Sequence, residues 1–161
     1  MSTTAPRTPE GEIRRQWDRL SGRPGGKALF SFLLGRMVPY TGSMGARVEE
    51  MGPGHARVTL RDRRRVRNHL RSVHAVALMN LAELTTGLAF IYAMPADARS
   101  ILRALTIEYH KKARGRLTAE AAAPLLESSE EREIEVRADI RDEAGDVVAT
   151  GVARWLVGPR R

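Results

Sequence analysis

Near the N-terminus, apolar residues recur at the spacing of a helix. Two short segments, Glu12–Leu20 and Lys27–Val38, carry apolar residues on one side, and Pro39 is expected to end the second. Further along, the run Val73–Tyr92 is apolar on every side, which is typical of a buried helix. A membrane span is not expected, because polar and ionisable side chains interrupt this run: His74, Asn80, Glu83, Thr85 and Thr86.

Elsewhere the period is two, which indicates strands. Segments 44–50 and 55–62 alternate around turn residues and predict a hairpin, with Met44, Ala46 and Val48 on one face of the first strand. Four more strand-like segments follow the long helix: 101–112, 117–123, 133–141 and 147–157. In two of them an apolar face is expected, formed by Ile101, Leu105, Ile107 and Tyr109 and by Ile134, Val136, Ala138 and Ile140.

This order of elements predicts an α+β fold with a mostly antiparallel sheet. A helix that is apolar all round is best buried by a sheet that curls around it, which is the hotdog architecture, here with extra N-terminal helices. A second subunit would cover the faces that the sheet leaves open. We expect a disordered tail over residues 1–11, N-terminal helices over 12–38 and a single hotdog domain over 39–158.

The amino-acid composition excludes some classes of site and function. The 161 residues suit one domain, and the absence of cysteine excludes disulfides and thiolate zinc sites, so no metal site is expected. The N-terminus lacks the apolar segment of a signal peptide, so a soluble cytoplasmic protein is expected. The net charge of +8 comes almost entirely from arginine. Nothing except the charge supports nucleic-acid binding, because aromatic residues are not interleaved with the basic runs. This role is therefore the least favoured.

Glu83 is the most informative single residue. A carboxylate on a buried helix must be paired or hydrogen-bonded, because its desolvation is costly. From the pattern alone, a structural pairing of Glu83 with Arg71 or with a neighbouring amide competes with a catalytic role.

The residues around this helix carry a resemblance to a known family. Asn68, the triplet His74-Ala75-Val76 and the triplet Leu81-Ala82-Glu83 are spaced as in the signature of hotdog-fold acyl-CoA thioesterases of the phenylacetate-pathway type. The longer run Arg67–Glu83 is similar to a group of bacterial tetrameric acyl-CoA thioesterases, and Ile107–Gly115 resembles the strand after the helix in that group. The resemblance covers roughly Val38–Val157.

The resemblance implies hydrolysis of an acyl-CoA or acyl-carrier thioester. Glu83 would be the nucleophile or general base, the backbone N–H of Ala75 the oxyanion donor, and Asn68 the amide that orients water or substrate. In this family the carboxylate of one subunit works with the N–H and the amide of the partner subunit. The resemblance therefore implies a homodimer, and in the tetrameric group a dimer of dimers. Three positions depart from the signature: Ala75-Val76 replaces Gly-Gly, Arg71 replaces Gly, and Glu83 replaces the commoner Asp.

Further residues are expected to bind the substrate. The expected contacts to it come from His74, Asn80, Thr86 and Arg71. Coenzyme A is part of the substrate and not a separate cofactor. Its phosphates are expected to bind Arg65, Arg67, Lys111, Lys112 and Arg114. Two alternatives stay open. One is an acyl-CoA-binding sensor without turnover. The other is a hydroxyacyl-thioester dehydratase that uses His69 and Glu83, which lie fourteen positions apart.

Overall fold

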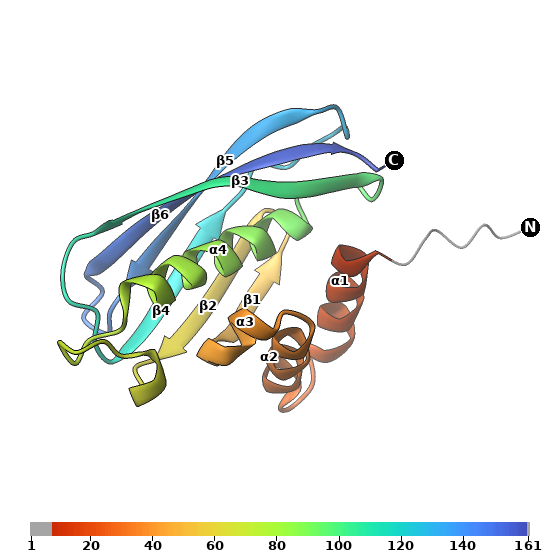
Figure 1. The fold of residues 1–161 in the computed structure, drawn as a ribbon. Coiled ribbons are helices and arrows are strands. Elements are labelled where there is room, and N and C mark those ends of the chain that lie inside the picture. The colour runs from red at the N-terminus through yellow and green to blue at the C-terminus, as the bar shows by residue number, and fades with distance from the viewer. Residues whose placement is uncertain (1–7, 161) are drawn as a thin grey trace, which may run out of the picture.

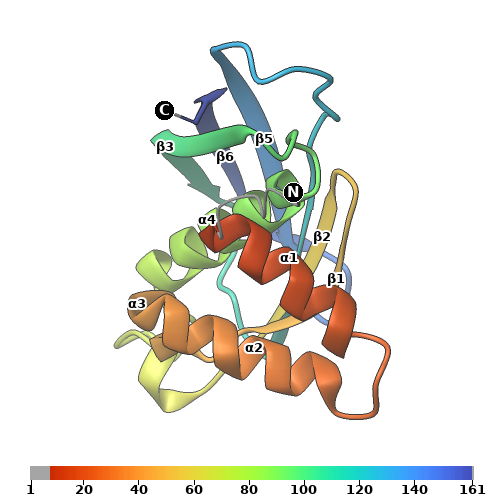
Figure 2. The ribbon, with the colours of Figure 1, turned by 90° about the vertical axis from the view of Figure 1, so that its right-hand side faces the viewer.

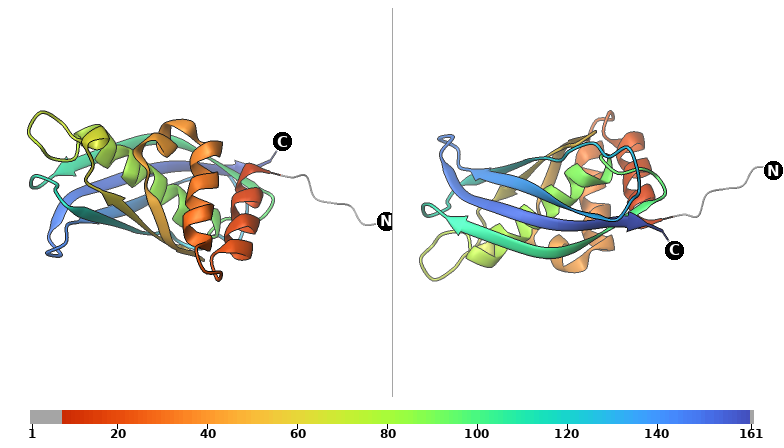
Figure 3. Two further views of the ribbon diagram at one scale, coloured as in Figure 1. Left: turned by 90° about the horizontal axis from the view of Figure 1, so that it is seen from below. Right: turned by 90° about the horizontal axis from the view of Figure 1, so that it is seen from above.

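A six-stranded antiparallel sheet curls around one long helix (Figure 1). The computed structural model describes residues 8–160. The helix, α4 (Ala75–Ile91), lies on the concave face of the sheet, as the views from below and above also show (Figure 3). The strands run in the spatial order β1 (Arg47–Gly52), β2 (His55–Arg61), β4 (Arg116–Ala122), β5 (Arg132–Arg141), β6 (Val147–Pro159) and β3 (Ala98–Tyr109). This is the predicted hotdog architecture, and the α+β class is confirmed.

Three helices precede the sheet: α1 (Pro9–Leu20), α2 (Gly26–Met37) and α3 (Pro39–Met44). Figure 2 shows α1 and α2 side by side, with α3 next to α4. The Thr8 hydroxyl caps α1 by accepting a hydrogen bond from the Gly11 N–H at 3.1 Å. Residues 9–11 therefore belong to a helix and not to the predicted tail, whose residues 1–7 lie outside the described part. The division into helices 12–38 and a domain 39–158 stays a prediction.

Pro39 was predicted only to end a helix, and it also begins one. It occupies the first turn of α3, where its missing N–H costs nothing and its fixed φ suits a helix. Gly45, at a φ of +66°, ends α3. Because this short helix includes the buried Met44, strand β1 starts at Arg47 and not at residue 44.

The core lies between α4 and the concave face of the sheet. Val136, Ala138 and Ile140 of β5 are fully buried there, as their alternation predicted. At Gly151 of β6 the helix approaches the sheet so closely that a Cβ atom would lie 2.6 Å from the Cβ of Ala82. A glycine is required at this point because any side chain would push α4 off the sheet.

The two edges of the sheet differ. Strand β1 is packed against α2, whereas one side of β3 has no strand partner within residues 8–160. The predicted apolar face of β3 is wrong at its ends, since Ile101 and Tyr109 are 52% and 49% exposed, and a bulge between Leu102 and Ala104 shifts the register. A long edge strand with exposed apolar side chains is a surface that pairs readily with another chain.

None of the helices within residues 8–160 is long and apolar enough to cross a membrane.

Candidate active site

The loop before α4 is organised by Asn68. Its Oδ1 accepts hydrogen bonds from the N–H groups of Leu70 and Ser72, at 3.0 and 3.2 Å, and from the Ser72 hydroxyl. The preceding short helix η1 (Arg64–Val66) and the loop are joined by a bond from the His74 N–H to the Val66 carbonyl at 2.7 Å. The side-chain oxygen of Asn68 therefore shapes the loop. Of its side-chain amide, the N–H groups stay available for a substrate or water.

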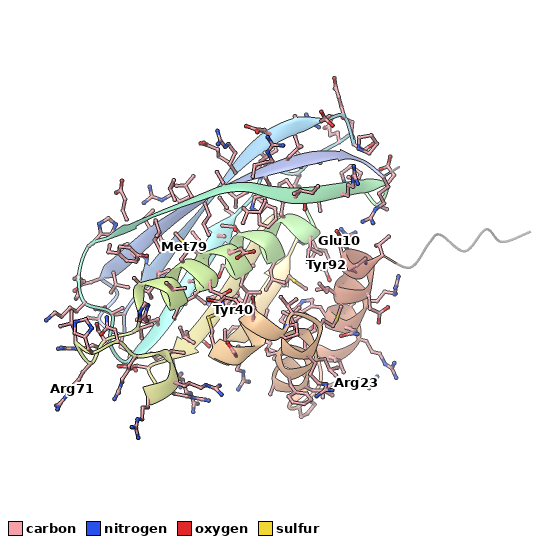
Figure 4. The ribbon with its side chains drawn as sticks, in the orientation of Figure 1. Glu10, Arg23, Tyr40, Arg71, Met79 and Tyr92 are labelled. Carbon is pink, nitrogen blue, oxygen red and sulfur yellow. The ribbon has the colours of Figure 1, made fainter. Side chains whose placement is uncertain are left out.

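Arg71 is the one residue other than glycine with a left-handed conformation in the described part of the chain, at a φ of +55°. The thioesterase signature has glycine here, which adopts this conformation at no steric cost. The guanidinium of Arg114 donates to the carbonyls of Arg71 and Leu70 at 3.3 and 3.4 Å, which braces the strained turn. Figure 4 shows Arg71 at the tip of the molecule, projecting from the loop.

The first N–H groups of α4 have no carbonyl partner within the helix. His74 is its N-cap, and its Nδ1 accepts from the Val76 N–H at 3.1 Å, so the ring is held by a capping contact. The neighbouring Ala75 N–H has no hydrogen-bond partner within residues 8–160, and Ala75 is exposed. Unpaired N–H groups and the positive end of the helix dipole make this position suitable for a developing negative charge.

Tyr109, at the end of β3, fixes the same helix end. Its hydroxyl donates to the Ala75 carbonyl at 3.0 Å, which ties the first residue of α4 to the sheet edge. Burial raises the pKa of the Tyr109 hydroxyl, so the donor stays protonated at neutral pH.

Glu83 is exposed in the single chain, which corrects the expectation of a buried carboxylate. It lies one turn from Met79 and two turns from Val76, on the one side of α4 that the sheet and helices leave uncovered. The pairing with Arg71, which was the structural alternative to a catalytic role, is absent from the ion pairs of the described residues. Since α4 rises about 1.5 Å per residue, Glu83 and the Ala75 N–H are about 12 Å apart along the axis, too far to act on one carbonyl group.

Two predicted substrate-binding residues of α4 have internal partners. Asn80 is buried, and its Oδ1 accepts from the hydroxyl of Thr41 at 3.0 Å, which ties α3 to α4. Thr86 is fully buried and donates to the Glu83 carbonyl at 3.0 Å, so it does not share the exposed side of Glu83. Both residues support the helix that carries Glu83.

The residues predicted to bind phosphates are also largely engaged. Arg67 pairs with Asp62 at 2.6 Å. Lys111 lies 2.7 Å from both Asp142 and Asp146; these contacts raise the pKa of Lys111, and the ion pair lowers that of Asp142. Lys112 is exposed, and Arg65 lies at the wall of a cavity.

That cavity is a feature that the sequence patterns did not reveal. It has a volume of about 590 Å³ and lies between α2, α3, β1, β2 and the loop after β2. The basic stretch Arg61–Arg67 was visible in the sequence, and Arg65 was predicted to bind phosphate, but the approach of Arg36, Arg47 and Arg116 to the same space was not. Among the described residues, no three His, Asp or Glu side chains are placed to hold a metal ion.

Comparisons with known proteins place these features in context. A family model described as a domain of unknown function (DUF4442) matches residues 26–157. A solved structural-genomics protein designated APC5556 is 30% identical over 92% of this chain and 99% of its own, with a TM-score of 0.82. The Pseudomonas aeruginosa protein PA5026, described as of unknown function and a probable thioesterase, is 26% identical over 81% of this chain and 93% of its own, with a TM-score of 0.74.

A mutant of the phenylacetic acid degradation protein PaaI from Thermus thermophilus covers 73% of this chain and 97% of its own, with a TM-score of 0.63. At 22% identity it is evidence of the shared fold. The predicted resemblance to hotdog-fold thioesterases is thereby confirmed. A search among curated proteins gave no match.

Proposed function

The chain belongs to the family described as a domain of unknown function (DUF4442), built on the hotdog fold, and from this we propose that it is a thioester hydrolase acting on acyl-CoA or acyl-carrier substrates. The observation that carries the proposal is the placement of two groups on α4. An unpaired N–H at Ala75 and an exposed carboxylate at Glu83 occupy one helix, at the spacing that the thioesterase signature has.

Two copies of α4 complete the site. Met79 lies midway between Ala75 and Glu83, on the exposed side of the helix and labelled in Figure 4. If two α4 helices cross in opposite directions about a twofold axis near Met79, Ala75 of each chain meets Glu83 of the other, because such an interface is the same patch on both subunits. The unpaired edge of β3, with Ile101 exposed, supports the same dimer.

The reaction follows from these groups. The thioester carbonyl oxygen accepts the Ala75 N–H, and Glu83 of the other chain removes a proton from a water whose oxygen attacks the carbonyl carbon, or attacks it directly. The tetrahedral oxyanion is stabilised at the helix N-terminus. When water attacks, the carbon–sulfur bond then breaks, the thiolate takes up the proton held by Glu83, and a carboxylic acid and a free thiol leave. When Glu83 attacks directly, the thiolate leaves first, the acyl group stays on Glu83 as an anhydride, and the thiolate takes up a proton that hydrolysis of this anhydride releases. In the direct route, water afterwards hydrolyses the acyl-enzyme anhydride and regenerates Glu83.

The decisive experiment is thiol release from a panel of acyl-CoA thioesters of different chain length. We expect Glu83→Gln to lower kcat by at least about 10²-fold, because a general base contributes about that much or more. The matched control is Glu135→Gln, which removes a carboxylate from the exposed outer face of β5 and should leave kcat unchanged. Equal thiol release by the wild type and Glu83→Gln would refute the catalytic assignment.

The same panel separates the alternatives. A dehydratase would hydrate enoyl-thioesters and lose this activity in a His69 variant. A sensor would bind acyl-CoA saturably without releasing thiol.

A further inference from the structure

Six arginines line the cavity beside α2 and β1. They are Arg36, Arg47, Arg61, Arg63, Arg65 and Arg116, and the lining contains one carboxylate, that of Glu49. Glu49 pairs with Arg47 at 3.4 Å. The other five arginines have no ion-pair partner within residues 8–160. The cavity therefore has a strongly positive potential, which a low-dielectric wall focuses inward.

The arrangement of these arginines is costly without an anion. Arg61 and Arg116 lie directly opposite each other on the paired strands β2 and β4, and like charges at such positions repel. Gly45 leaves the room that the Arg65 guanidinium occupies, because a Cβ atom at this glycine would collide with it. The fold thus holds several guanidinium groups against one space, where a bound anion would relieve the repulsion.

The remaining polar groups of the wall are already used. The hydroxyls of Ser31, Thr41 and Thr59 donate to the Lys27 carbonyl, to Asn80 and to Glu49, respectively. The free side-chain donors of the lining are therefore guanidinium N–H groups. Guanidinium groups carry the opposite charge to phosphate and can donate two parallel hydrogen bonds to two of its oxygens. They contain no hydrogen-bond acceptor for the donor groups of a neutral sugar or an amine.

We propose that this cavity is a binding site for a phosphate-bearing ligand. Its volume of about 590 Å³ exceeds what one or two phosphate groups fill. The exposed ring of Phe32 and the side chains of Leu34 and Leu84 offer an apolar wall for the rest of the molecule. The ligand is therefore a phosphomonoester or pyrophosphate attached to an apolar or flat group. It is either one end of the thioester substrate or a separate molecule.

Titration calorimetry with inorganic pyrophosphate, on the full chain, tests the site. We expect the double variant Arg61→Gln/Arg65→Gln to weaken binding at least tenfold. The control is Arg19→Gln, which removes one arginine charge from the exposed side of α1 and should change affinity less than twofold. Pyrophosphate should also raise the urea unfolding midpoint of the wild type but not that of the double variant, which shows that the variant is folded and the site lost.

The kinetics of thiol release identify the source of the phosphate. A higher KM for acyl-CoA with unchanged kcat in the double variant assigns the cavity to the phosphorylated end of the substrate. An unchanged KM, with pyrophosphate binding lost, assigns it to a separate phosphorylated ligand. The proposal is overturned if the wild type does not bind pyrophosphate, or if Arg19→Gln loses as much affinity as the double variant. The calorimetric outcomes do not depend on whether the protein is a hydrolase, whereas the KM comparison requires that activity.

Discussion

At the residue scale, Ala75 matters through its backbone and not its side chain. Its N–H has no hydrogen-bond partner in the part of the chain that the structure describes, and any non-proline residue would supply the same donor. The replacement of the signature glycine by Ala75 therefore preserves the donor that the proposed oxyanion stabilisation requires. Arg71 replaces a glycine at a larger cost, and the contacts of Arg114 to its carbonyl and that of Leu70 compensate by bracing the left-handed turn.

Ala75→Pro removes this donor while leaving the helix intact. Proline suits the first position of a helix, and His74 before it already has φ −64° and ψ 142°, the conformation that a following proline requires. We expect kcat for thioester hydrolysis to fall about 10²- to 10³-fold with an unchanged unfolding midpoint, measured by thiol release and urea denaturation. Ala75→Gly, which keeps the N–H, should stay active. Full activity of Ala75→Pro would exclude the oxyanion role.

The sequence motif predicted the position of Ala75 at the start of the helix, but it did not predict the exposure of Glu83. An all-apolar run implies burial only if something covers every side, and in the single chain the side of Val76 and Glu83 is open. Likewise the phosphate-binding predictions for Arg67 and Lys111 depended on the charge of each residue. The carboxylates that pair with them, Asp62 for the first and the Asp142–Asp146 hairpin for the second, are brought close by folding.

At the element scale, the far end of α4 is fixed to α1 through Tyr92. Its hydroxyl donates to the carboxylate of Asp18, and the Arg14 guanidinium lies 4.8 Å from the centre of its ring. Burial, and next the hydrogen bond to Asp18, raise the pKa of the Tyr92 hydroxyl far above its ordinary value. Figure 4 shows Tyr92 beside α1, at the opposite end of the molecule from Arg71.

This contact gives stability an alkaline limit. Because the folded pKa is raised, the contribution of Tyr92 is complete below pH 10 and declines above it, where the unfolded chain loses the proton first. The decline is at most about 1.4 kcal/mol per pH unit. We expect Tyr92→Phe to be less stable than the wild type at pH 8 and to approach it between pH 10 and 11, measured by urea unfolding. A constant difference from pH 8 to 11 would contradict the assignment.

At the scale of the whole molecule, the proposed function gives one chain two half sites. The separation of Ala75 and Glu83, about 12 Å along the helix, requires a second copy to bring them to one carbonyl group. The uncovered side of α4 and the unpaired edge of β3 are the surfaces that such a copy would cover. The homodimer is thus part of the proposed function, and a dimer of dimers stays a prediction of the resemblance.

Complementation tests the shared site. Glu83→Gln and Ala75→Pro are each expected to be inactive alone, whereas refolding an equal mixture of both forms hybrids with one doubly defective site and one intact site. About a quarter of the wild-type thiol-release activity should return, because about half of the dimers are hybrids and each has one working site. If both groups act within one chain, the mixture stays inactive, and the twofold arrangement is wrong.

The sequence alone predicted the central helix, most of the strands and the location proposed for the chemistry. Hydrophobic periodicity is a local property, so the central helix, the alternating strand β5 and the motif from Asn68 to Glu83 were all predictable. The surroundings of each group became visible only in the folded chain. Folding exposed Glu83, paired Arg67 and Lys111 with carboxylates, and gathered Arg36, Arg61, Arg63, Arg65 and Arg116 around one cavity. The reason is that burial, pairing and repulsion depend on distances between segments far apart in the chain, and the curl of the sheet around α4 sets those distances.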